Sequence, residues 1–228
     1  MRRRFDLLVA DLDGTLVDSE AQLVGQVVET LRAHGFDAPG GRAIAETIGL
    51  PLDEVFRRAA PAADGGVLDA LCVHYRRVAD TPEFVSRFCL YTGVAPTLEA
   101  LRAAGVHIVV ATSKGRKTTV DILEHCRIRA VVDEVIGGDC VRRGKPHPEM
   151  VDRARSLFPA PAERTMVVGD TSFDVEMGKS AGVATCAVTY GMQPAEALRA
   201  LQPTFVIDRF DALGGLLLFL EGCAPSQP

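Results

Sequence analysis

Six short, strongly apolar runs recur along this chain and alternate with amphipathic segments. The apolar runs are FDLLVA, VHIVVAT, DEVIGG, RTMVVGD, ATCAVTY and TFVID. They are almost continuously hydrophobic, which is typical of strands covered on both faces. The segments between them, such as TVDILEHC and HPEMVDRARSLF, have the periodicity of helices. Strands that alternate with helices predict an α/β fold with a doubly wound, Rossmann-like parallel sheet.

The stretch 19–88 departs from this alternation, because it contains several helical patterns and no convincing strand. One of its helical stripes, ended by Gly35, consists of Leu23, Val24, Val27, Val28 and Leu31. We expect an α-helical insertion after the first strand. It would lie above the carboxyl ends of the strands, where open α/β sheets bind ligands.

Composition and charge narrow the class of protein. With 228 residues, 47% hydrophobic and 24% charged, the chain has the balance of a globular enzyme or binding domain. The formal net charge of −5 and the scattered basic residues do not favour nucleic-acid binding. No apolar run reaches the ~18 residues of a membrane span, and no signal-peptide core follows the basic start. We therefore expect a cytoplasmic protein without nucleic-acid or membrane partners.

The first apolar run leads directly into two carboxylates, in the stretch FDLLVADLDGTLVDS. Side chains two residues apart on extended backbone point the same way, so Asp11 and Asp13 can converge while Leu12 returns to the core. Gly14 then permits a sharp exit from the strand. The alternative is an Asx turn that only closes the strand.

Three later stretches place polar side chains at two further strand ends and in a loop. VVGDTSFDVEMG contains Asp170 and Asp174, VVATSK contains Thr112 and Ser113, and RRGKPHPEM contains Lys145. Each also has a simpler interpretation: strand-end Asp, Thr and Ser residues often cap the next helix, and loop lysines are usually solvated. Lys145, however, precedes Pro146, which favours extended backbone and a fixed position.

In a parallel sheet these strand ends lie on one edge, so all of these groups would meet in one crevice. Two like charges ~4 Å apart repel by about 4 kcal/mol at an effective dielectric near 20, so four carboxylates need a cation. An all-oxygen set with open positions suits Mg²⁺, which shares its shell with waters and a phosphate. The sequence therefore predicts a magnesium site assisted by Lys145.

In order along the chain, DLDGT, the threonine of VVATSK, the lysine of GKPHPE and the stretch GDTSFD resemble the four motifs of the haloacid dehalogenase superfamily. The closest likeness is to its phosphoglycolate phosphatase and β-phosphoglucomutase branch, through LYTGVAPTLEALRAAG and GKPHPEM. The resemblance implies an α/β core over 1–17 and 89–228, with an α-helical cap over 18–88.

The resemblance also implies the chemical roles. Asp11 would be the nucleophile that forms an aspartyl phosphate, and Asp13 the general acid and base. Mg²⁺ would be bound by Asp11, the Asp13 backbone carbonyl and Asp170, with support from Asp174. The residues expected to hold phosphate oxygens are Thr112 and Lys145, assisted by the backbone of Ser113, and Lys145 would also steady Asp11.

These roles imply a Mg²⁺-dependent phosphatase of a small phosphomonoester, with 2-phosphoglycolate as a candidate, acting as a monomer or homodimer. Within the cap, ETIGLPLDEVF resembles the substrate-facing loop, which makes Arg42, Thr47 and Gly49 candidate contacts. A surface position for Arg42 and a turn at Gly49 are the alternatives.

Four other functions deserve comparison with the phosphatase. A sugar phosphomutase and a pyrophosphatase remain open, because the sequence does not reveal which acceptor takes the phosphoryl group. A phosphonatase is excluded, since the expected cap has no lysine for a Schiff base. A phosphorylatable receiver module would also use an acidic cluster, a Thr or Ser and a Lys. It would be about half as long, however, and would lack both the insertion and a use for Asp13.

Overall fold

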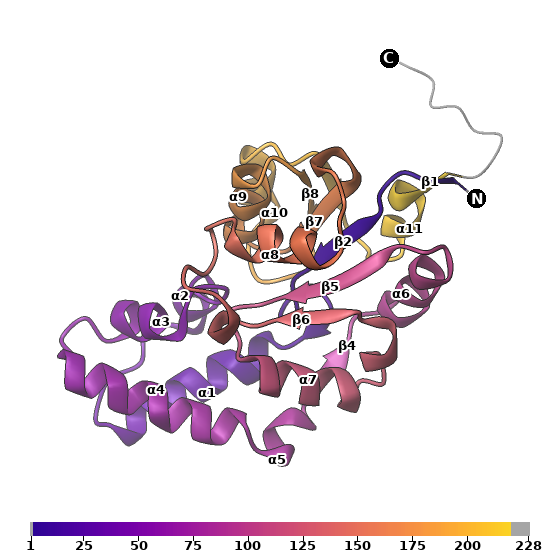
Figure 1. The fold of residues 1–228 in the computed structure, drawn as a ribbon. Coiled ribbons are helices and arrows are strands. Elements are labelled where there is room, and N and C mark those ends of the chain that lie inside the picture. The colour runs from indigo at the N-terminus through magenta and orange to yellow at the C-terminus, as the bar shows by residue number, and fades with distance from the viewer. Residues whose placement is uncertain (1, 220–228) are drawn as a thin grey trace.

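The computed structural model describes residues 2–219, and its centre is a sheet of six parallel strands (Figure 1). In spatial order the strands are β6 (Glu134–Ile136), β5 (His107–Ala111), β2 (Leu7–Ala10), β7 (Thr165–Gly169), β8 (Ala184–Val188) and β9 (Phe205–Ile207). All neighbouring pairs are parallel. Each strand falls within one of the six apolar runs, so the predicted α/β class and its strand positions are confirmed.

Helices cover both faces of this sheet, because successive strand side chains point to opposite sides. The core helices are α6 (Val94–Ala103), α7 (Arg116–His125), α8 (Glu149–Leu157), α9 (Ser172–Ser180), α10 (Ala195–Ala200) and α11 (Ala212–Leu217). Leu7 and Val9 of β2 belong to one hydrophobic cluster with α8 and α9, while Leu8 and Ala10 belong to another with α6 and α7. Three short 3-10 helices are η1 (Arg129–Val131), η2 (Gly138–Cys140) and η3 (Ala162–Arg164).

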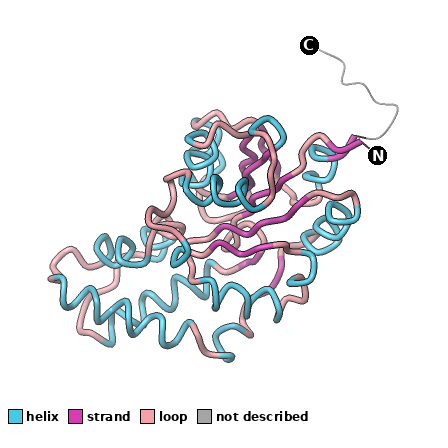
Figure 2. Tube along the Cα trace, in the orientation of Figure 1, coloured by secondary structure: helices cyan, strands magenta, loops and turns pink. Residues whose placement is uncertain are grey.

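A group of helices follows β2 and lies to one side of the sheet, at the lower left of Figure 1 and in cyan in Figure 2. It comprises α1 (Glu20–Ala33), α2 (Gly41–Ala45), α3 (Leu52–Ala59), α4 (Gly65–Ala79) and α5 (Pro82–Val85). α4 packs against α1 and α3. The apolar side chains of this group and those of one sheet face form a single continuous cluster.

Two short antiparallel pairs complete the fold, and the apolar pattern did not indicate either of them. β3 (Val17–Asp18) pairs with β4 (Cys89–Leu90), which joins the entry and exit of the helical group. β1 (Arg2–Arg3) pairs with β10 (Leu218–Phe219). Two-residue strands have no periodicity to detect, so only the folded chain reveals them. Within residues 2–219, no helix combines the length and apolar character that a bilayer crossing requires.

Candidate active site

The chain segment that follows β2 brings Asp11 to the carboxyl edge of the sheet. The Asp11 backbone N–H donates to the Val168 carbonyl at 2.9 Å, which ties it to β7, and Leu12 is fully buried. Gly14 then turns the chain with φ +79°, and a Cβ atom on it would lie 2.1 Å from Asp170 Oδ2. Glycine is therefore needed at this position both for the turn and for the close approach of Asp170.

Three of the four predicted carboxylates converge in the folded chain. Asp11, Asp170 and Asp174 each offer an oxygen within 4.8 Å of the others, and all three are buried. Asp170 is held by Thr15 Oγ1, which donates to Oδ1 at 2.8 Å, and by the Met192 N–H, which donates to Oδ2 at 2.8 Å. These contacts leave both Asp170 oxygens oriented and fixed at the edge of the cluster.

Asp174 combines two functions that the sequence presented as alternatives. Its Oδ2 accepts hydrogen bonds from the backbone N–H and the hydroxyl of Thr171, at 3.1 and 2.6 Å, which completes the capping box of α9. Its Oδ1 accepts a hydrogen bond from Lys145 at 2.6 Å. The start of α9 is therefore also part of the charged cluster.

Lys145 is not the solvated loop lysine of the simpler interpretation. Its ammonium lies 2.5 Å from Asp11 Oδ1 and 2.6 Å from Asp174 Oδ1, and its side chain is 0% exposed. Burial by itself lowers the pKa of Lys145, but the charges of Asp11 and Asp174 outweigh that effect, so its pKa is raised and the ammonium stays charged.

The cluster nevertheless has one ammonium for three carboxylates. Burial raises the pKa of Asp11 well above its ordinary value against the opposing Lys145 charge, and the Asp174 and Asp170 charges add to the increase. Burial and the Asp174 charge raise the pKa of Asp170 to about 7. A further cation would stabilise the ionised form of these carboxylates. Their donor atoms are all oxygens, which fits Mg²⁺.

Asp13 lies apart from this cluster and has a cationic partner of its own. Its Oδ2 is 3.3 Å from the Lys114 ammonium, whereas its Oδ1 is buried without a hydrogen-bond partner among the described residues. The sequence motifs did not single out Lys114. Lys114 could have been predicted from its position directly after Thr112 and Ser113, at the end of β5.

Thr112 and Ser113 occupy the carboxyl end of β5, as predicted. The Thr112 hydroxyl accepts a hydrogen bond from the Lys114 N–H at 3.2 Å, while the N-cap of α7 is Gly115, so Thr112 does not cap that helix. Ser113 Oγ donates to the Gly49 carbonyl at 2.5 Å. This bond joins the end of β5 to the loop between α2 and α3.

A cleft of about 560 Å³ lies between these strand ends and the helical group. From the core it is lined by Asp11, Asp13, Thr112, Ser113 and Lys114, among others. The lining residues of the helical group are the largely apolar set Leu23, Val27, Ile48, Gly49, Leu50, Pro51, Leu52, Val55, Tyr75 and Ala79, together with the charged residues Asp53, Arg76 and Asp80. The cleft therefore places the charged groups of the core opposite a wall that is mostly apolar and carries three charged residues.

The three candidate contacts of the helical group differ in position. Gly49 lines the cleft. Arg42 is 75% exposed, pairs with Glu46 and is not among the lining residues, and Thr47 is buried with its hydroxyl donating to the Ile44 carbonyl. Of these three candidate contacts, only Gly49 lines the cleft.

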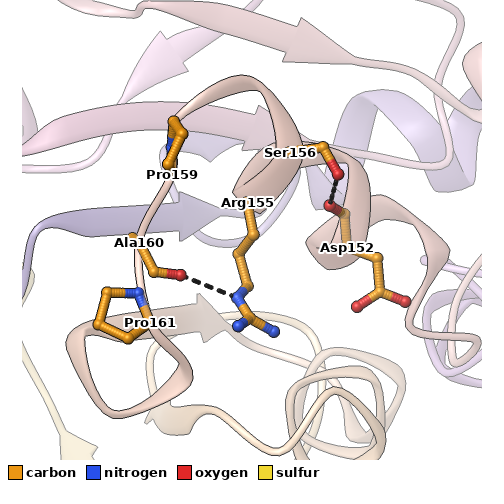
Figure 3. A pocket seen from close by; sticks show the side chains of 6 residues that line it. All are labelled: Asp152, Arg155, Ser156, Pro159, Ala160 and Pro161. Carbon is orange, nitrogen blue, oxygen red and sulfur yellow. Dashed lines mark hydrogen bonds between the residues drawn. The ribbon is translucent and has the colours of Figure 1, made fainter.

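A second hollow, of about 550 Å³, lies at the end of α8 (Figure 3). Its polar groups are used locally, because Arg155 Nε donates to the Ala160 carbonyl at 3.1 Å and Ser156 Oγ donates to the Asp152 carbonyl at 2.8 Å. These residues lead into the start of β7, and so they lie at the opposite edge of the sheet from Asp11. The charged cluster and the first cleft are therefore the candidate active site.

Comparisons with known proteins agree with this geometry. Residues 8–188 match the family described as haloacid dehalogenase-like hydrolase. A probable phosphatase named IndB from Dickeya dadantii is 35% identical over 211 residues, with 92% of each chain covered. The pyrophosphatase PpaX of Halalkalibacterium halodurans is 29% identical over 210 residues, covering 90% of this chain and 94% of the relative.

Comparison with a solved structure supports the same family. The crystal structure of a "predicted phosphoglycolate phosphatase" from Haemophilus somnus superposes with a TM-score of 0.83 at 25% identity, covering 95% of this chain and 99% of the other. The matched family spans most of the chain, including the four motifs that carry the charged cluster. The chain therefore belongs to the haloacid dehalogenase-like hydrolases, in the branch that contains phosphatases.

Proposed function

We propose that this protein is a Mg²⁺-dependent phosphatase that hydrolyses a small phosphomonoester through an aspartyl-phosphate intermediate. The observation that carries the proposal is the placement of Asp11 and Asp13 at the floor of one cleft, each beside its own lysine. A nucleophilic carboxylate and a separate acid are what a two-step transfer of a phosphoryl group requires.

In the first step an Asp11 oxygen attacks phosphorus, the bond to the leaving oxygen breaks, and Asp13 gives that oxygen its proton. In the second step Asp13 takes a proton from water, the water oxygen attacks the phosphorus, and phosphate leaves with Asp11 regenerated. Lys145 keeps Asp11 in place, and Thr112 and the Ser113 backbone bind phosphate oxygens. Such positioning, together with positive charge, supplies most of the catalysis in phosphoryl transfer.

The groups that would hold Mg²⁺ are Asp11, Asp170 and the Asp13 backbone carbonyl, with Asp174 in support. When bound, the ion supplies positive charge that neutralises the carboxylates and the phosphate oxygens. We further propose that residues 18–88 act as the cap that selects the substrate, and that the protein works in the cytoplasm on a phosphorylated metabolite.

We expect Mg²⁺ to stabilise the folded protein, because it binds the converged carboxylates only when they are assembled. At about 100 times its dissociation constant, the ion should raise Tm by about 5–10 °C. Differential scanning calorimetry with and without MgCl2, at equal ionic strength, measures this shift. Asp170→Asn is the matched control and should abolish most of the shift, whereas an equal shift in both proteins would remove the metal site from the proposal.

A panel of phosphate compounds tests the reaction and its acceptor. The cleft of about 560 Å³ is larger than 2-phosphoglycolate needs, so the panel includes that ester, β-glucose 1-phosphate, pyrophosphate and larger phosphomonoesters. We expect Mg²⁺-dependent release of phosphate from monoesters, with the Asp11→Asn protein as the blank. Conversion of glucose 1-phosphate to the 6-phosphate without phosphate release would instead show a mutase, and selective cleavage of pyrophosphate would show a pyrophosphatase.

A further inference from the structure

We propose that Lys114 is a positioning residue for Asp13. Its ammonium holds one oxygen of that carboxyl group and leaves the other available to the leaving-group oxygen of the substrate. The proposal rests on the proposed function, in which Asp13 is the general acid, and it assigns Lys114 a part in that step.

The contact between the two side chains is largely shielded from solvent. Lys114 Nζ lies 3.3 Å from Asp13 Oδ2, and the two side chains are 11% and 10% exposed. At this exposure the attraction between the charges is screened far less than at an open surface. The second oxygen, Oδ1, has no hydrogen-bond partner among the described residues. One oxygen of Asp13 is therefore held while the other is free for the substrate.

A buried aromatic ring fixes the position of Lys114 itself. The ammonium lies 5.4 Å from the centre of the Phe88 ring, within cation–π range, and Phe88 is 1% exposed. The Lys114 N–H also donates to the Thr112 hydroxyl. Because Phe88 immediately precedes β4, the residue that supports Lys114 lies where the chain returns from the helical group to the core.

The two lysines thus contact different carboxyl groups. Lys145 contacts Asp11 and Asp174, whereas Lys114 contacts Asp13. Within the described residues, Lys114 is the charged partner of the Asp13 carboxyl group, so its removal frees that side chain to rotate. Proton transfer needs the acid within about 2.6–3.2 Å of the reacting oxygen, so a small displacement of Asp13 lowers the rate strongly.

The test compares two leaving groups, because a positioned acid matters only where the leaving oxygen needs a proton. We expect Lys114→Met, which keeps an apolar chain over Phe88, to lower kcat/KM for an alkyl phosphate by about 10- to 100-fold. The value for p-nitrophenyl phosphate should stay near wild type. Lys114→Arg should restore much of the loss, and Lys179→Met, which removes a lysine charge from α9 away from the cleft, should change neither value.

A double-mutant cycle shows whether Lys114 acts through Asp13. In an Asp13→Asn background, Lys114→Met should cause little further loss on the alkyl ester. Circular dichroism and magnesium titration should match wild type, and Lys114→Gln is the second neutral variant if the methionine protein folds poorly. Equal losses on both esters, or full additivity with Asp13→Asn, would overturn the positioning role while leaving the phosphatase proposal intact. A wild-type protein that hydrolyses neither ester would overturn both proposals.

Discussion

Asp11→Asn should abolish phosphate release, lowering kcat by a factor on the order of 10⁴ or more, the scale of other nucleophile deletions. Asparagine has the shape of aspartate and can still accept a hydrogen bond from Lys145, but its amide does not attack phosphorus at a useful rate. The measurement is Mg²⁺-dependent phosphate release from the best ester of the panel. A second readout is the trapping of phosphorylated protein, which should be seen in wild type only.

The structure indicates that this variant stays folded. The change removes one negative charge from a buried cluster in which Asp11, Asp170 and Asp174 share one ammonium, so it relieves repulsion. Circular dichroism and thermal unfolding provide the control. If a folded Asp11→Asn protein releases phosphate at nearly the wild-type rate, Asp11 is not the nucleophile.

Asp13→Asn should lower kcat/KM for alkyl phosphates by about 10²- to 10⁴-fold, the range of general acid catalysis. The loss on p-nitrophenyl phosphate should be much smaller, because nitrophenolate leaves without a proton. The ratio of the two kcat/KM values is the quantity to measure, since it isolates the first step. Equal losses on both esters would contradict the assignment of Asp13 as the acid.

The second step gives an independent readout of the same variant. Asp13 would also activate the water that hydrolyses the aspartyl phosphate, so kcat should fall even for the nitrophenyl ester. Stopped-flow measurements should therefore show a burst of nitrophenolate followed by slow turnover. Ser156→Ala is a suitable control, because it removes a hydroxyl from the end of α8, at the opposite edge of the sheet from Asp11. It should show no burst.

Much of the fold and of the core site could be predicted because both depend on strand ends. Continuous apolar runs identify buried parallel strands, and the parallel arrangement places all their carboxyl ends on one edge. Asp11, Thr112 and Asp170 each follow such a strand directly, so their approximate meeting place was already defined by the pattern. Lys145 could be included because Pro146 restricts the backbone beside it.

The helical group was predictable as helices but not as a binding surface. Its stripes of apolar residues show which helix faces are buried, yet they do not show which of those residues border a cleft. Arg42 illustrates the difficulty, since it was a candidate substrate contact and is exposed and paired with Glu46. Tyr75 lines the cleft and carried no recognisable motif. Long-range packing between helices decides such positions.

The sequence by itself determined the strands, the helical insertion and the set of acidic and basic groups that meet at one edge, because local periodicity and chain direction suffice for these. The family resemblance already implied that Lys145 steadies Asp11. Only the tertiary structure decided that Lys145 also pairs with Asp174 and that Lys114 pairs with Asp13. Pairing depends on distances of a few ångströms between residues far apart in the chain, and on buried supports such as Phe88 that no local pattern records.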